Sequence, residues 1–310
     1  MNIVFDMYNC GMGNNGGTRT VIKCAQAIEN IGHRCDIVAH VDKFTWFEHK
    51  KPLVTIPTNA DIVIATGCTT VATTLSSQAP YKVWYIRGHE TWNYDESTLG
   101  HLYNQPLMNI TNSYGLKAKV ESFGAKAKVV HQGIDLDEWN DRGKSRNSKI
   151  RIGCLYQKKP TKRWIDFVKL SEILGQEEYE YVGIGETLRN DEFLCDYVCN
   201  SGSEALRDLY STCDIWFLPT VLEGMHNIGL EAALCGCLLV GNDDPMNGMI
   251  YDYLFDGKTG MVYPSGDIEY AAKLIRSPNW GLVPNAISFI RNNIGDRETN
   301  MEKFVRLITC

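Results

Sequence analysis

Residues 218–233 read LPTVLEGMHNIGLEAA, in which the end of an apolar strand leads through a glycine-containing loop into a helical run. We predict the strand over residues 214–218 and the start of the helix at Asn227 or Ile228. Strands that alternate with helices in this way build parallel sheets with crossover helices. The stretch therefore favours an α/β fold and places a loop at the carboxyl end of a strand.

The same alternation extends from this stretch toward both ends of the chain. Apolar runs predict further strands over residues 2–5, 35–39, 61–65, 82–86 and 128–131, and over residues 150–155, 179–183, 238–240 and 261–262. Helical periodicity marks residues 20–31 and 114–123, and the last stretch, 285–308, is helical with a break near Gly295. We therefore expect an α/β protein with parallel sheets.

The domain organisation follows from length and from one polar segment. A chain of 310 residues exceeds what one hydrophobic core usually serves. Residues 141–149 are polar and lack an apolar period, which predicts a linker. We expect Rossmann-like domains over residues 1–145 and 146–290, and a helix over residues 291–310 that returns toward the N-terminal domain. Such a pair of domains places a ligand cleft between the carboxyl ends of its sheets.

Composition and charge narrow the class of protein further. Hydrophobic residues make up 44% and charged residues 22%, a globular balance that excludes a disordered or fibrous chain. The net charge of -6 argues against a strong general attraction to nucleic acid or anionic membranes. An odd number of cysteines, 11, indicates reduced thiols. With no apolar run of about 18–20 residues and no leader segment, we expect a soluble, cytoplasmic protein without an integral membrane segment.

Two glutamates eight positions apart indicate which ligand the loop and helix of residues 218–233 could bind. If the helix begins at Asn227 or Ile228, its first backbone N–H groups can hold a diphosphate. Glu231 then lies about 6 Å further along the helix axis, where its carboxylate can accept hydrogen bonds from the two hydroxyls of a ribose. Glu223 lies in the loop on the other side of the phosphates, where a sugar would be. This element can therefore bind ribose, diphosphate and sugar in order.

The segment resembles the Glu-x7-Glu signature of retaining GT-B glycosyltransferases, in particular the large family 4 of sugar-nucleotide-dependent enzymes. The resemblance continues through LCGCLLV at residues 234–240 and FDGKTGMV at residues 255–262, which look like the family's small-residue helix, strand and D-G-x-x-G turn. It implies a GT-B fold, with two Rossmann-like domains facing each other across a cleft. It also implies a hexosyl- or pentosyltransferase that moves a sugar, with retention, from a UDP- or GDP-sugar to a hydroxyl acceptor. No metal and no cofactor besides this donor is expected, and the acceptor would be a glycan or other glycoconjugate.

The resemblance assigns roles in the predicted C-terminal domain. Glu223 and Lys162 would be catalytic, and Lys162 lies where the family has a lysine after its first strand. The family's arginine is replaced by Cys154, so Lys158 or Lys159 would have to substitute for it. A turn at Gly185 would lie near the nucleobase. The donor-binding residues implied in this domain are Lys158, Lys159, Gly185, Gly224, Met225, His226, Asn227, Ile228 and Glu231. The adjacent acids Asp243 and Asp244 are interpreted as a loop rather than a metal site.

The predicted N-terminal domain resembles the family's acceptor side. The run GMGNNGGTR at residues 11–19 allows close approach of the backbone, so that Gly16 and Gly17 would lie near the donor phosphate and sugar. The run YIRGHETW at residues 85–92 follows a strand and carries His89, the third expected catalytic residue. The loops 41–57 and 93–105 are expected to carry acceptor choice. The acceptor-side candidates are Trp46, Arg87, Glu90 and Trp92.

Three alternative functions remain open from the sequence. A viral-type glycosyltransferase could act on hydroxymethylated bases of DNA, which would then be the partner in place of a glycan. Its basic surface would come from Lys43, Lys50, Lys51, Lys82, Arg87, Lys117, Lys119, Lys126 and Lys128. A sugar-nucleotide epimerase and an inactive sugar-nucleotide binding module are the other two, since both can share the GT-B fold.

Overall fold

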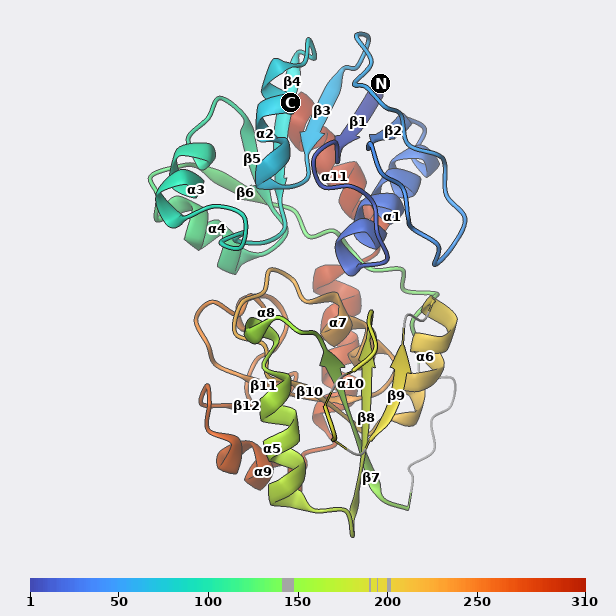
Figure 1. Cartoon of the computed structure of the whole chain (residues 1–310), viewed down its shortest axis with the longest axis vertical. Coiled ribbons are helices and arrows are strands. Elements are labelled where there is room, and N and C mark those ends of the chain that lie inside the picture. The colour runs from blue at the N-terminus through green and yellow to red at the C-terminus, as the bar shows by residue number, and fades with distance from the viewer. Residues whose placement is uncertain (141–147, 190, 194, 200–201) are drawn as a thin grey trace. The chain divides into compact units, whose positions relative to one another are not determined.

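The computed structural model describes residues 1–140, 148–189, 191–193, 195–199 and 202–310 (Figure 1). The chain forms two compact units, of which unit 1 comprises Met1–Gly133 and Asp296–Cys310, and unit 2 comprises Ile134–Gly295. Each unit is an α/β domain with a six-stranded sheet. All strand pairs in both sheets are parallel, so the predicted α/β fold with parallel sheets is confirmed.

The sheet of unit 1 has the strand order β2-β1-β3-β4-β5-β6. Its strands are β1 (Asn2–Asp6), β2 (Arg34–Val38), β3 (Ile62–Ala65), β4 (Tyr81–Ile86), β5 (Met108–Thr111) and β6 (Ala127–Val129). Its helices are α1 (Gly16–Asn30), η1 (Cys68–Thr70), α2 (Val71–Ser76), α3 (Glu96–Tyr103), α4 (Tyr114–Glu121) and α11 (Arg297–Thr309). In Figure 1 the C-terminal helix α11 lies beside α1, and the two helices pack on each other.

The sheet of unit 2 has the order β12-β11-β10-β7-β8-β9. Its strands are β7 (Ile150–Tyr156), β8 (Tyr179–Gly185), β9 (Asp196–Cys199), β10 (Ile215–Leu218), β11 (Leu238–Asn242) and β12 (Met261–Tyr263). Its helical segments are η2 (Pro160–Lys162), α5 (Trp164–Leu174), α6 (Ser203–Thr212), α7 (Asn227–Leu234), α8 (Met249–Asp252), α9 (Ile268–Arg276), α10 (Leu282–Phe289) and η3 (Ile290–Ile294), the last a short π-helix.

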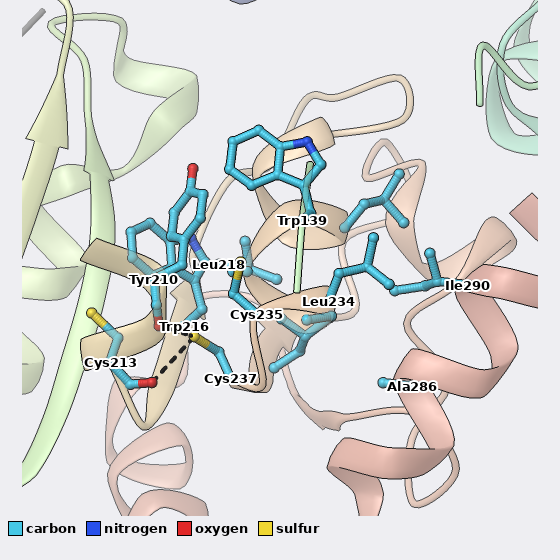
Figure 2. Packing of buried hydrophobic residues seen from close by; sticks show 14 of the residues in the cluster. Trp139, Tyr210, Cys213, Trp216, Leu218, Leu234, Cys235, Cys237, Ala286 and Ile290 are labelled. Atoms are coloured by element: carbon cyan, nitrogen blue, oxygen red, sulfur yellow. Dashed lines mark hydrogen bonds between the residues drawn. The ribbon is translucent and has the colours of Figure 1, made fainter. Parts of the chain in front are cut away.

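The core of unit 2 positions α7 against its sheet. Figure 2 shows Tyr210 of α6 and Trp216 of β10 in edge-to-face contact, with ring centroids 4.8 Å apart. Leu234 of α7 belongs to the same buried cluster, as does Cys237, whose thiol donates a hydrogen bond to the carbonyl of Cys213 at 3.3 Å. Close packing of this kind fixes α7, and with it the loop that precedes α7.

The chain crosses between the units at Gly133–Ile134 and at Gly295–Asp296. The sequence prediction placed these crossings at residues 145–146 and 290–291. Residues that follow Gly133 join unit 2 because the side chains of Ile134 and Trp139 are buried in its core. The backbone N–H of Ile134 also donates to the carbonyl of Gly295 at 3.1 Å. Most of the expected linker, residues 141–147, lies outside the described residues.

Two strands, β5 and β9, were not predicted from the sequence. The first carries the buried polar residue Asn109, whose amide donates to the carbonyls of Tyr103 at 2.7 Å and Lys126 at 3.2 Å, so its sequence lacks an apolar run. The second is a short edge strand that is only partly buried. Helix α1 begins four residues before the predicted position because the side chain of Asn15 accepts a hydrogen bond from the Thr18 N–H and caps it. None of the helices in the described ranges combines the length and apolar character required to span a bilayer.

Candidate functional site

The loop between β10 and α7 is held in one conformation by main-chain contacts. Strand β10 is buried between β7 and β11, and α7 begins at Asn227, as predicted. The N–H of Glu223 donates to the carbonyl of Met246 at 3.2 Å, and the N–H of Gly248 donates to the carbonyl of Glu223 at 3.0 Å. A Cβ on Gly248 would collide with the carbonyl of Gly224, which shows how closely the two segments run. The backbone under Glu223 is therefore rigid.

Lys162 and Glu223, predicted from separate patches of the sequence, form an ion pair. Lys162 ends η2 in the loop after β7, and β7 is the neighbour of β10 in the sheet. The N–H of Val221 donates to the carbonyl of Thr161 at 2.9 Å, which joins the two loops at the carboxyl edge. Burial, followed by the charge of Lys159, lowers the pKa of Lys162 to about 8, although the ion pair itself favours the charged form. The buried ion pair thus lies beside His226, which precedes the start of α7.

His226 immediately precedes α7 and lies beside Glu223. Its Nε2 is 3.5 Å from the Glu223 Oε1, and its side chain is only 4% exposed. Burial, followed by the charge of Lys162, holds the pKa of His226 well below its usual range. The carbonyl of His226 accepts a hydrogen bond from the Tyr253 hydroxyl at 2.9 Å. The imidazole therefore favours its neutral form, and the main chain that carries it is held in place.

Helix α7 carries the second glutamate of the predicted pair. Glu231 is buried, and its Oε2 accepts a hydrogen bond from the Tyr210 hydroxyl at 3.3 Å. Gly229 allows the helix to approach Tyr253, since a Cβ at this position would lie 2.2 Å from the Tyr253 hydroxyl. The first N–H groups of a helix have no acceptor within the helix, so those at Asn227 and Ile228 form its electropositive end.

The remaining predicted donor residues of unit 2 differ in exposure. Lys158 and Lys159 are exposed in the loop after β7, while Met225 is buried. Gly185 ends β8, and a Cβ there would lie 2.2 Å from the Tyr197 hydroxyl, so this glycine is required for packing. Cys154, in the position of the family's arginine, is fully buried inside β7. Its side chain therefore lies in the core rather than in the loop.

In unit 1, the predicted glycines begin α1 at the carboxyl edge of the sheet. Gly16 has open space where a Cβ would lie, so the backbone is accessible there. The Arg87 guanidinium, which follows β4, donates from Nη1 to the carbonyl of Gly17 at 2.7 Å and from Nη2 to the carbonyl of Thr66 at 3.1 Å. Arg87 thus ties the start of α1 to the end of β3.

His89, which we expected to face a ligand, is buried in the structure. Its side chain is 1% exposed, its Nδ1 is 2.9 Å from the Tyr103 hydroxyl, and its Nε2 is 3.0 Å from the Glu96 Oε1. The imidazole turns inward because α3 supplies both partners, seven and fourteen residues further along the chain. No local signal in the sequence predicts this arrangement, since neither partner lies in the motif that contains His89.

The acceptor-side candidates of unit 1 are organised by the loop after β4. The Glu90 Oε2 accepts hydrogen bonds from the Cys68 N–H at 2.9 Å and from the Asn93 side chain at 3.3 Å, so Glu90 anchors the loop. Trp92 is 55% exposed, and its ring lies over Gly88. Trp46, by contrast, packs on the core of unit 1. The loop therefore presents a fixed aromatic ring.

Sequence reasoning missed Tyr210 and Tyr253, which hold Glu231 and the carbonyl of His226. Tyr210 lies on the buried face of α6 with Leu206 and Leu209, and Tyr253 directly follows α8, so both tyrosines look like core residues. The phenolic hydroxyl is the only hint of a second role, because a buried hydroxyl needs a hydrogen-bond partner.

No group of three or more His, Cys, Asp and Glu side chains in the described part of the chain is arranged to hold a metal ion. Asp243 and Asp244 lie in the loop after β11, as predicted. Their carboxylates accept hydrogen bonds from backbone N–H groups, Asp243 from Ser265 at 2.8 Å and Asp244 from Met246 at 2.9 Å. These acids therefore stabilise the loop.

The two domains together have the fold of GT-B glycosyltransferases. The sequence matches no protein-family model and no curated protein. Among solved structures, the chain is similar to Anabaena HepE in complex with UDP-glucose, at a TM-score of 0.82 and 14% identity over 100% of this chain and 99% of that one. It is also similar to sucrose-phosphate synthase from Thermosynechococcus elongatus, at a TM-score of 0.79 and 14% identity over 99% and 98% of the two chains. A glycosyltransferase from Rickettsia africae matches at a TM-score of 0.73 and 12% identity, over 99% and 97%.

Proposed function

We propose that this protein is a retaining glycosyltransferase, which moves a hexosyl or pentosyl group from a nucleoside diphosphate sugar to a hydroxyl acceptor. The observation that carries the proposal is the contact between Lys162 and Glu223 beside the start of α7. It gathers a cation, a carboxylate and a helix N-terminus, which are the groups needed for a diphosphate and a sugar. The fold, which is shared with glycosyltransferases, supports this interpretation.

Each group in unit 2 then has a separate task. The ammonium of Lys162 and the N–H groups at Asn227 and Ile228 bind the diphosphate, and Glu223 accepts hydrogen bonds from sugar hydroxyls. Glu231, already oriented by Tyr210, accepts hydrogen bonds from the ribose. Donor binding in this scheme exchanges the partners of the Lys162–Glu223 ion pair, because the diphosphate takes the ammonium and the sugar takes the carboxylate.

The chemical step we propose takes place on one face of the sugar. The bond between the anomeric carbon and the diphosphate oxygen breaks, and the acceptor oxygen forms its bond to that carbon on the same side. The acceptor's proton passes to an oxygen of the departing diphosphate. Lys162 and the start of α7 stabilise the charge that develops on the leaving group. A double-displacement route would instead need two carboxylates that flank the bond, and in this scheme Glu231 binds the ribose.

We propose that the donor is a UDP- or GDP-sugar and that no divalent cation takes part. The HepE structure named above contains UDP-glucose, which makes UDP-sugars the first donors to test. Positive charge at the leaving group would come from Lys162 and from the helix dipole, with Lys158 and Lys159 nearby. Transfer should therefore persist in the presence of EDTA.

For the acceptor we propose a glycan or glycoconjugate. The exposed indole of Trp92, held on the loop that Glu90 anchors, offers an apolar face to a sugar ring. The alternative acceptor, modified DNA, would need free cations, yet several of the expected ones are engaged. Lys50 pairs with Asp36 and Lys119 with Glu96. Strong salt dependence of acceptor binding would nevertheless favour DNA.

The proposal is tested by mass spectrometry of the products from a panel of UDP- and GDP-sugars and hydroxyl acceptors. A mass increase of one sugar on an acceptor, with the anomeric configuration of the donor seen by NMR, is the expected result. Isomerised donor without added acceptor would identify an epimerase, and donor binding without turnover would identify an inactive module. We also propose a cytoplasmic location, since cysteines without disulfide partners suit a reducing compartment.

A further inference from the structure

We propose that His226 recognises a hydroxyl group of the donor sugar through its Nδ1 atom and so contributes to the choice of sugar. The inference rests on the proposed function, because it takes the pocket at the start of α7 to hold a nucleoside diphosphate sugar. It assigns to the imidazole a role distinct from that of the backbone around it.

The backbone of His226 is held in an unusual conformation. Its φ of 48° and ψ of 72° lie in the left-handed region, which it shares with one other non-glycine residue of the described chain, Arg163. The turn is fixed by two hydrogen bonds to the His226 carbonyl, from the Tyr253 hydroxyl at 2.9 Å and from the Gly229 N–H at 3.1 Å. A residue with a Cβ is strained in this conformation, and such strain persists where the surroundings fix it, often at ligand sites.

The side chain of His226 is deeply buried without hydrogen bonds. It is 4% exposed, and neither ring nitrogen has a hydrogen-bond partner among the described residues. Buried polar atoms in folded proteins are nearly always paired, so each exception calls for an explanation. A ligand that enters beside the ring would supply the missing partner.

The surroundings of the ring determine which kind of partner fits. The imidazole is neutral, so one of its nitrogens carries a hydrogen and the other is an acceptor. Nε2 lies 3.5 Å from the carboxylate of Glu223, and a lone pair facing that negative charge would be repelled. The hydrogen is therefore placed on Nε2, which leaves Nδ1 as a buried acceptor.

A buried acceptor selects a ligand group that donates a hydrogen bond. An ionised diphosphate has no hydrogen to donate, whereas every sugar hydroxyl has one. Glu223, the neighbour of the ring, is the residue to which we assign the sugar. The geometry therefore favours the sugar over the diphosphate as the partner of His226. A site built to bind a hydroxyl discriminates against a sugar that lacks it.

The test compares nucleotide and sugar-nucleotide binding in variants of the full chain. His226→Gly removes the ring and accepts the left-handed backbone, and His226→Asn tolerates the same φ with a shorter polar side chain. Dissociation constants for UDP, UDP-glucose, GDP and GDP-mannose are measured by calorimetry. We expect His226→Gly to raise the dissociation constant of the sugar nucleotide that the wild type binds, by about tenfold. The affinity for UDP or GDP alone should be unchanged. Lys162→Gln is the contrasting variant, and it should weaken the binding of the nucleotide and of the sugar nucleotide to the same extent.

A series of deoxy-sugar donors identifies the hydroxyl. One deoxy donor should bind the wild type about tenfold more weakly than its parent, and His226→Gly should bind the two equally. Equal loss of UDP and UDP-sugar affinity in His226→Gly, or no loss at all, would overturn the inference. Thermal melting verifies folding, and if His226→Gly does not fold, the same comparisons are made with His226→Asn. Failure of the wild type to bind any of the four probes would refute the proposed function itself, and this inference with it.

Discussion

At the scale of single residues, the charge of Lys162 should limit activity at alkaline pH. Its pKa is lowered to about 8 by burial and by Lys159, so the free enzyme loses this positive charge above that pH. Because only the charged form stabilises the leaving diphosphate, kcat/KM for the donor should fall above about pH 8. In Lys162→Arg the side chain stays charged, and the decline should move beyond pH 9.

The matched measurement is the pH dependence of kcat/KM in both proteins, together with Lys162→Ala, which should lose most activity at every pH. An identical alkaline decline in wild type and Lys162→Arg would show that another group is responsible.

Glu223 should be essential for transfer, while its loop keeps its conformation without the side chain. It lies in a loop fixed by main-chain bonds, so removal of its side chain leaves the backbone in place. Glu223→Ala should reduce kcat/KM by roughly 100-fold or more, since it removes a contact to the sugar and the partner of Lys162. The measurement is steady-state kinetics below the melting temperature of the variant, which should be lowered because the buried Lys162 loses its carboxylate partner. Glu269→Ala on α9 is the control acid. Wild-type turnover in Glu223→Ala would remove the assignment.

Individual residues also show which features of the site could be predicted from the sequence and which could not. The spacing of Glu223 and Glu231, and the start of α7 between them, follows local rules of helix periodicity and could be predicted. The contact of Lys162 with Glu223 joins positions 61 residues apart and depends on which strands are neighbours in the sheet. The burial of His89 depends on Tyr103 in a helix that follows it, which no motif around His89 encodes.

At the scale of elements, His89 joins β4 to α3 and should stabilise the loop between them. His89→Ala leaves the Tyr103 hydroxyl without its partner and should lower the Tm by about 3–8 °C. We also expect a higher KM for the acceptor with little change in KM for the donor, because the loop carries Trp92. Calorimetry and steady-state kinetics measure the two effects. A large loss of kcat with normal stability would instead indicate that His89 contacts the substrate.

The contact of His89 with Glu96 should make stability depend on pH. His89, followed by Lys119, lowers the pKa of Glu96 from the ordinary value of 4.5. As the pH falls below about 4.5, the unfolded chain takes up a proton before the folded chain does, so this contribution to stability is present above that pH and lost below it. The difference in melting temperature between wild type and His89→Ala should therefore narrow in acid, to the part that the contact with Tyr103 contributes. A constant difference at all pH values would contradict this explanation.

Elements with clear apolar runs were the predictable ones. Strands β1, β4, β7 and β8 were predicted within one or two residues at either end, because apolar runs mark them. Strand β5 was missed because the buried amide of Asn109 interrupts its apolar pattern and is satisfied only by tertiary partners.

At the scale of the whole molecule, unit 1 depends on the last helix of the chain. Met301, Phe304, Val305 and Ile308 of α11 are buried in its core. Each such side chain stabilises a fold by about 1.5–3 kcal/mol, so four of them approach the total stability of a typical domain. Deletion of residues 296–310 should therefore unfold unit 1 and leave unit 2 folded.

Limited proteolysis with mass spectrometry of the fragments measures this outcome. Unit 2 has its own core over Ile134–Gly295, so fragments from that range should resist cleavage while those from unit 1 do not. Phe304→Ala is the milder control, with an expected loss of about 3–5 kcal/mol. Full protection of both units after the deletion would contradict the role assigned to α11.

The most direct measurement is a crystal structure of the protein with bound UDP or GDP. Our account predicts the diphosphate at the start of α7, within hydrogen-bond distance of the Asn227 N–H and the Lys162 ammonium, and the ribose at the Glu231 carboxylate. A nucleotide bound elsewhere on the chain, with Lys162 and Glu223 still paired to each other, would contradict it.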